Sequence, residues 1–173
     1  LTQPAWVTAC TGIDALSHSV ETAVTSVRNE RSRRHAREAF SLLAHSLPIV
    51  SEDPENLDAR EAVQVGAALA GAAIEFSMLG AAHAAANPLT THFDVVHGQA
   101  VGVMLPAFVR FNGKDSQVET EYSEMLKAGD LPVDGASPAE ALADWIASLL
   151  EGFQMKSCIS DGIRNTNAWA PRI

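Results

Sequence analysis

Five polar residues of this 173-residue chain stand at spacings that could bring them to one point. Asp14 and His18 are four residues apart, so on a helix both side chains lie on one face. His83 and Asn87 share that spacing, and His97 follows after a short expected loop. Three imidazoles and one carboxylate could thus converge from three helices. This ligand set suits Fe(II) or Zn(II) and is too rich in nitrogen for magnesium or calcium.

Each of these residues also has an ordinary structural interpretation. A single histidine in an alanine-rich helix is more often a satisfied core residue than a ligand, and an Asp/His pair at this spacing is common by chance. The surroundings favour a metal site. His83 lies in a strongly apolar run, where an unpaired imidazole costs free energy. His97 stands at an expected loop-to-helix junction beside Gly98, where the backbone can approach a ligand closely.

Helical patterns dominate the chain and no strand pattern recurs, which predicts an all-α fold. We expect Thr11 to cap the first helix, so that Asp14 falls in the first turn, where the helix dipole favours an anion. Helices are expected to end before Pro48 and Pro88, because the residue before proline is pushed out of the α region. A break or kink is expected at Pro106. The expected helices are residues 12–26, 32–46, 56–86, 97–111, 116–128 and 137–153, with residues 89–96 as an irregular loop.

The end of the chain divides into a well-patterned and a poorly patterned part. Ser137, Pro138 and Glu140 form a good helix start, with a serine cap, a proline at the first position and a glutamate three residues after the cap. Residues 155–173 show no clear periodicity. We therefore predict a single all-helical domain over residues 1–173, with residues 155–173 as a tail.

Composition excludes several classes of partner. The net charge of −9 disfavours nucleic acid, because no basic field is available to neutralise phosphates. The arginines between residues 28 and 37 are interleaved with glutamates and are interpreted as a solvated helix face. The apolar stretch 62–89 is interrupted by polar residues, so we expect a buried helix and no membrane span. Cys10 and Cys158 form no motif, so we expect a reducing, cytoplasmic location.

Three blocks of the sequence resemble, in order, the signatures of the iron-containing (group III) alcohol dehydrogenases. The segment 11–21 resembles Gly-x-Asp-Ala-Leu-x-His-x-x-Glu, and the segment 80–89 resembles Gly-x-x-His-x-x-x-His-x-Leu. The segment 96–112 resembles the third block, His-Gly followed by Leu-Leu-Pro and Phe-Asn. Together the matches cover about residues 6–112 and extend weakly to about residue 153.

The resemblance implies a fold and a reaction. Members of this family have an N-terminal α/β domain that binds NAD(P) and a C-terminal helical domain, of the dehydroquinate synthase-like kind, that holds the metal. The metal ligands carry over as Asp14, His18, His83 and His97. The metal would be Fe(II) or Zn(II), the substrate a small-molecule alcohol or aldehyde, and the hydride acceptor NAD(P) of the full-length parent.

One position departs from the family pattern. The second signature usually has a further histidine four residues after the metal ligand, and here Asn87 occupies that position. Asparagine donates and accepts hydrogen bonds but does not shuttle a proton at neutral pH, so we expect Asn87 to orient the substrate. His92 is an alternative proton relay, although a solvated loop histidine is the more ordinary interpretation.

The phosphate-binding half of the family is not visible in this sequence. No glycine-rich phosphate loop follows a strand pattern, and Gly66, Gly71 and Gly80 are interpreted as packing glycines of a buried helix. We therefore expect the nucleotide-binding domain to be absent and the isolated chain to be inactive. The face that would meet that domain should be apolar, so we expect a homo-oligomer. The alternatives are a related glycerol dehydrogenase, maleylacetate reductase or dehydroquinate synthase-like domain, or a non-catalytic helical interaction module.

The two histidines of the segment 83–92 should differ in their effect on metal binding. We expect His83→Ala to lose far more metal affinity than His92→Ala, because only His83 belongs to the predicted ligand set. Metal content after dialysis measures this. Equal metal content in the two variants would contradict the assignment.

Overall fold

The computed structural model describes residues 2–155 of the chain, and this part consists of α-helices without a strand, as the sequence predicts. None of these helices is long and apolar enough to cross a membrane. The helices are α1 (Ala5–Val24), α2 (Glu30–Glu52), α3 (Leu57–Glu75), α4 (Ala81–Phe93), α5 (His97–Asn112), α6 (Ser116–Ala128) and α7 (Pro138–Gly152).

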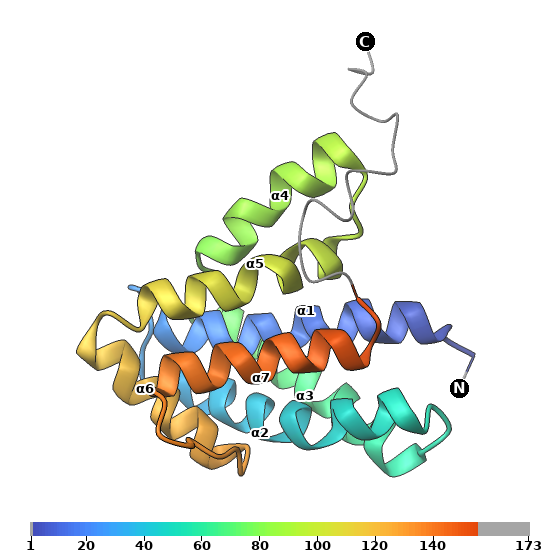
Figure 1. Cartoon of the computed structure of the whole chain (residues 1–173), viewed down its shortest axis with the longest axis horizontal. Coiled ribbons are helices and arrows are strands. Elements are labelled where there is room, and N and C mark those ends of the chain that lie inside the picture. Colours follow the sequence, from blue (N-terminus) through green and yellow to red (C-terminus); the bar gives the residue numbers. More distant parts are fainter. Residues whose placement is uncertain (1, 156–173) are drawn as a thin grey trace.

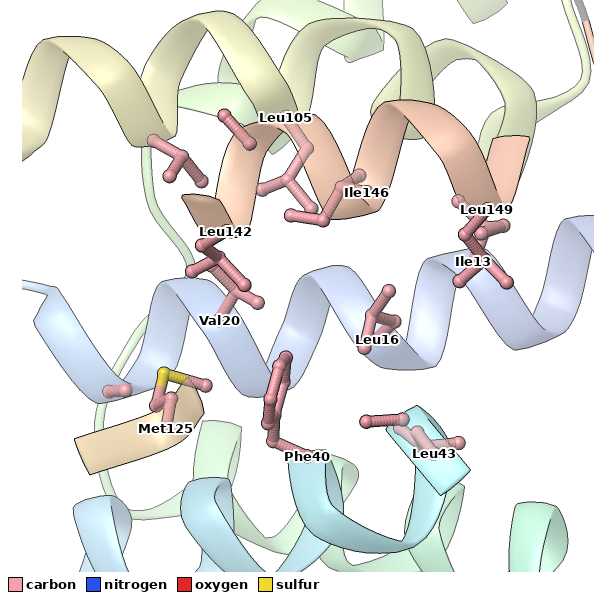
Figure 2. Close-up of a cluster of buried hydrophobic side chains, with 14 of the residues drawn as sticks. Ile13, Leu16, Val20, Phe40, Leu43, Leu105, Met125, Leu142, Ile146 and Leu149 are labelled. Atoms are coloured by element: carbon pink, nitrogen blue, oxygen red, sulfur yellow. The ribbon is translucent and has the colours of Figure 1, made fainter. Parts of the chain in front are cut away.

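The central helix of the bundle is α1, which is buried along most of its length (Figures 1 and 2). On one side, Leu16 faces Phe40 and Leu43 of α2. On the other side, Leu105 of α5 and Ile146 of α7 complete the core, and all five side chains are almost fully buried. Burial of each such side chain contributes about 1.5–3 kcal/mol, so this core holds α1 firmly in place.

Helix α4 stands apart from the main bundle, above α5 in Figure 1 and away from α2. It packs mainly on α5, through a small apolar cluster of Ala86, Ala100 and Val101 with Leu89 at its edge. Its contact with α1 is limited. The position of α4 therefore depends on α5 and on a few polar contacts with α1.

Three prolines lie inside helices, which for Pro48 and Pro88 is contrary to prediction. Pro48 lies inside α2, Pro88 inside α4 and Pro106 inside α5, so α2 runs to Glu52 and the expected loop after residue 89 is helical to Phe93. A proline removes one helical hydrogen bond and crowds the preceding turn. In α2 and α5 the core buries a residue on each side of the proline, namely Leu47 and Val50 in α2 and Leu105 and Val109 in α5. This tertiary packing stabilises the helix beyond what local preference allows.

The long helix expected over residues 56–86 is also wrong, because the chain breaks between α3 and α4. Contacts with the start of α2 hold the break in place. The guanidinium of Arg31 lies 3.6 Å from the centre of the Phe76 ring, and His35 stacks on the same ring. The side-chain amide of Asn29 donates a hydrogen bond to the Phe76 carbonyl. These contacts redirect the chain, so that α4 leaves the direction of α3.

Two helix starts are predicted from local capping signals, one at Ser137 and one at Thr11. The helix start at Ser137 is confirmed, because its side chain accepts a hydrogen bond from the Glu140 amide and Pro138 opens the helix. The start predicted at Thr11 is wrong, since α1 begins at Ala5 and the Thr11 hydroxyl donates to the Val7 carbonyl. Asp14 therefore lies inside α1 and not in its first turn.

A close backbone approach places α5 against α1. A Cβ atom built on Gly98 would lie 2.0 Å from the carbonyl oxygen of Cys10, so only glycine fits there. The sequence indicates an approach to a ligand at Gly98, but the observed approach is to α1. Among the predicted packing glycines, Gly66 contacts Leu43, whereas Gly71 lies on the exposed side of α3 with no neighbour within 4 Å. Gly80 does not lie inside a helix, since it is the N-cap of α4.

We expect Gly98→Ala to destabilise the protein by about 2 kcal/mol or more, because overpacking must push α5 away from the α1 backbone. The matched control is Gly71→Ala, which adds the same methyl group to an open helical position and should stabilise by about 0.5–1 kcal/mol. Urea unfolding followed by circular dichroism measures both. Equal effects of the two substitutions would show that α1 and α5 are not in close contact.

Candidate metal centre

Of the four residues predicted as metal ligands, the three histidines lie around one carboxylate oxygen of the fourth, Asp14. The Oδ1 atom of Asp14 is 3.3 Å from Nε2 of His83 and 3.6 Å from Nε2 of both His18 and His97. The rings of His18 and His83 stack with their centres 4.8 Å apart. Three imidazole nitrogens thus face one carboxylate oxygen.

Three helices supply these side chains. Asp14 and His18 lie one turn apart on α1, in the interior of the helix that the core holds most firmly. His83 lies in the first turn of α4, and His97 is the first residue of α5. The close approach at Gly98 places His97 beside α1, because Gly98 is its neighbour in the chain.

The donor atoms fit a transition-metal cation. The ligand atoms of Asp14, His83 and His97 all lie within 4.8 Å of one another, whereas His18 lies outside this group of three and approaches it through Asp14, at 3.6 Å. With bond lengths of about 2.0–2.2 Å, neighbouring ligands of a tetrahedral site are about 3.3–3.5 Å apart. The separations from Asp14 are close to that value, and one carboxylate with imidazoles is a donor set that Fe(II) or Zn(II) accepts.

The site has a closed side and an open side. The side chain of His83 is 5% exposed, whereas that of His97 is 40% exposed, with Asp14 and His18 between them. A small molecule can therefore reach the group from the side of His97 but not from the side of His83.

The charges of the site act on one another. Burial opposes protonation of His83, but its hydrogen bonds to Asp14 and Glu21 and their negative charges outweigh burial and raise its pKa to about 9. Burial would raise the pKa of Asp14, yet the hydrogen bond from His83 and the three nearby imidazoles lower it. Burial lowers the pKa of His18, against the opposing effect of Asp14. At neutral pH, His83 is thus protonated and Asp14 ionised.

A fifth polar residue, Glu21, belongs to this cluster, and no function is predicted for it from the sequence. Its carboxylate is buried and accepts hydrogen bonds from Nδ1 of His83, at 2.5 Å, and from the backbone amide of Ala82, at 2.7 Å. Glu21 follows Asp14 by seven residues, which is two turns on the same helix face. That spacing, together with the place of Glu21 at the end of the first signature block, was the available signal.

The two other candidate residues lie on α4. Asn87 is exposed and stands one turn after His83, so it is near the site. His92 is exposed near the end of α4 and not in a loop. Nine residues of helix place it about 13 Å along the axis from His83. This separation disfavours His92 as a proton relay.

This helical fold with its polar cluster has clear counterparts among known proteins. The chain belongs to the Fe-containing alcohol dehydrogenase family, whose C-terminal family model matches residues 8–167. It is 38% identical to the 1,3-propanediol dehydrogenase of Klebsiella pneumoniae over 110 residues, which is 64% of this chain and 28% of that protein. It is 29% identical to the 1-propanol dehydrogenase PduQ of Citrobacter freundii over 98% of this chain and 47% of that protein.

Solved structures agree with this assignment. A 1,3-propanediol oxidoreductase has a TM-score of 0.86 at 30% identity, over 93% of this chain and 42% of that chain. An alcohol dehydrogenase from Oenococcus oeni has a TM-score of 0.85 at 28% identity, over 92% of this chain and 42% of that chain. The chain thus spans less than half the length of these relatives. The predicted tail begins at Met155, which is buried in the core, and the rest of it lies outside the described residues.

We expect metal binding at this site to release about one proton at neutral pH. A cation on Nε2 of His83 must displace the proton that the pKa of about 9 retains, whereas the lowered pKa of His18 leaves that ring neutral. Zinc affinity should therefore rise about tenfold per unit between pH 6 and 8. Calorimetry in buffers of different ionisation enthalpy counts the proton, and a pH-independent affinity would contradict this.

Proposed function

We propose that this chain is the metal-binding part of an NAD(P)-dependent alcohol dehydrogenase or aldehyde reductase, in which Asp14, His18, His83 and His97 hold Fe(II) or Zn(II). One observation carries the proposal, namely the approach of three imidazole Nε2 atoms to a single oxygen of Asp14. Family membership gives the class of reaction.

The side chains of the site contribute differently to metal and substrate binding, according to their charge and exposure. Asp14 supplies the negative charge, and the imidazoles supply neutral nitrogen donors once His83 loses its proton. The exposed side at His97 admits the alcohol or aldehyde oxygen. When bound, a divalent cation supplies Lewis-acid polarisation of that oxygen.

Asn87 is proposed to orient the substrate. It lies one turn beyond His83 on α4, with its side chain in the exposed part of that helix. Its amide can donate and accept hydrogen bonds, but it has no proton to exchange at neutral pH. The proton of the alcohol therefore leaves through water or another group and not through Asn87.

The proposed substrates and hydride acceptor come from the relatives. The curated relatives include dehydrogenases of 1,3-propanediol and 1-propanol, which supports a small alcohol or its aldehyde. A sulfoacetaldehyde reductase from Bifidobacterium kashiwanohense, solved in complex with NAD+, has a TM-score of 0.83 over 96% of this chain and 42% of that chain, at 27% identity. We propose NAD(P) of the full-length parent as the hydride acceptor.

The ligand set can be tested on the chain itself. We expect anaerobic titration with Fe(II) or Zn(II) to give one ion per chain, with three nitrogen ligands and one oxygen ligand from the protein in X-ray absorption spectra at the metal edge. Separate alanine substitutions of His18 and His97 should each remove one nitrogen ligand. A spectrum unchanged by both substitutions, or an ion bound mainly by exposed carboxylates, would rule out the proposed site.

A further inference from the structure

Glu21 is a buried carboxylate on the same face of α1 as the proposed ligands. Only 4% of it is exposed, and it lies one turn beyond His18. Burial of an ionised carboxylate is costly unless strong hydrogen-bond donors surround it. The donors around Glu21 therefore indicate why the position holds a glutamate.

Both carboxylate oxygens of Glu21 are bonded to the first turn of α4. Oε1 accepts the backbone N–H of Ala82, and Oε2 accepts Nδ1–H of His83. Helix α4 has no cap of its own, because its N-cap residue is Gly80 and no acidic residue lies in its first turn. An anion at this helix start satisfies a free amide and interacts favourably with the helix dipole.

The bond to Nδ1 decides which nitrogen of His83 is available. A carboxylate can only accept, so Nδ1 must carry the proton. Nε2, which faces Asp14 at 3.3 Å, is then the nitrogen with the free lone pair once the ring is neutral. A carboxylate behind a ligating histidine fixes its tautomer and orientation in many metal sites.

We propose that Glu21 is a positioning residue of the metal centre: it holds the proton of His83 on Nδ1, directs Nε2 toward Asp14, and ties the start of α4 to α1. The proposal rests on the metal-binding function proposed for His83. Since α4 packs mainly on α5 and has little other contact with α1, the same carboxylate orients the ring and is the main direct tie between the two helices.

Gly80 leaves the space that this carboxylate occupies. A Cβ atom built on Gly80 would lie 2.7 Å from Oε1 of Glu21. The carboxylate is the end of a flexible side chain, but its two hydrogen bonds leave it no equivalent position. Gly80→Ala therefore displaces the carboxylate without removing it.

The decisive variant is Glu21→Gln, which keeps the size of the side chain. Glutamine has one accepting oxygen, whereas Ala82 and His83 both require an acceptor. If the oxygen faces Ala82, the glutamine NH2 group faces Nδ1 and favours a proton on Nε2, which blocks the metal. We expect zinc affinity to fall by about 10- to 100-fold. In zinc-loaded protein, the imidazole 15N signals of His83 should show loss of the Nδ1–H, Nε2–metal state.

The matched control is Glu121→Gln. Glu121 is as buried as Glu21, but its carboxylate pairs with Arg37 at 2.6 and 2.9 Å and does not contact the proposed ligands. We expect this variant to lose stability while its zinc affinity stays within about twofold of the unsubstituted chain. If both variants lose zinc affinity equally, the effect is general destabilisation and the proposal for Glu21 fails.

The remaining outcomes separate the two proposals. If His83→Ala abolishes zinc binding while Glu21→Gln retains full affinity, the metal site stands and the positioning function of Glu21 is wrong. If His83→Ala binds zinc normally, the proposed function itself fails. Should Glu21→Gln not fold by circular dichroism, Gly80→Ala decides. A folded Gly80→Ala variant with reduced zinc affinity supports the proposal, and one with unchanged affinity overturns it.

Discussion

The acidic face of α1, formed by Asp14 and Glu21, is the constraint on which the start of α4, and with it the candidate metal centre, depends. Both lie on a helix that the core encloses: Glu21 is buried, where an unpaired carboxylate would cost several kcal/mol, and Asp14 is partly buried beside it. Both are compensated by groups from elsewhere in the chain, namely the imidazoles of α4 and α5 and the backbone amide of Ala82. Apolar packing holds α1 to α2, α5 and α7, but this polar compensation determines where α4 begins.

Much of the helical content could be predicted, because local signals decide it. The start of α7 follows from Ser137 and Pro138, whose capping geometry needs no distant partner. The wrong predictions lie where contacts between residues distant in the sequence determine whether a helix continues or ends. Pro48 continues α2 because the core stabilises both sides of it, and the break after α3 depends on the clamping of Phe76 by Arg31 and His35 of α2. Neither contact has a signature in the local sequence.

The residues of the candidate site also divide into those that the sequence identifies and those whose function depends on contacts with another helix. Asp14 and His18 could be paired from helix spacing alone, and the signature blocks supplied His83 and His97. Glu21 ends the first signature block, but its function is not predicted, because a motif names the residue and not the amide and imidazole of α4 that it accepts from. The hydrogen bonds of Glu21 depend on where α4 begins. The start of α4 follows from the break between α3 and α4, which the apolar sequence of this region does not indicate.

The separate placement of α4 has a consequence for the dynamics of the protein. An ion held jointly by Asp14 and His83 would close a loop of 69 residues and cross-link a firmly packed helix to a loosely packed one. Detachment of α4 from the bundle would then require breakage of a coordination bond, so local opening of this helix and escape of the ion become linked equilibria. Amide hydrogen exchange in α4 would accordingly respond to metal concentration, while exchange in the core of α1 would not.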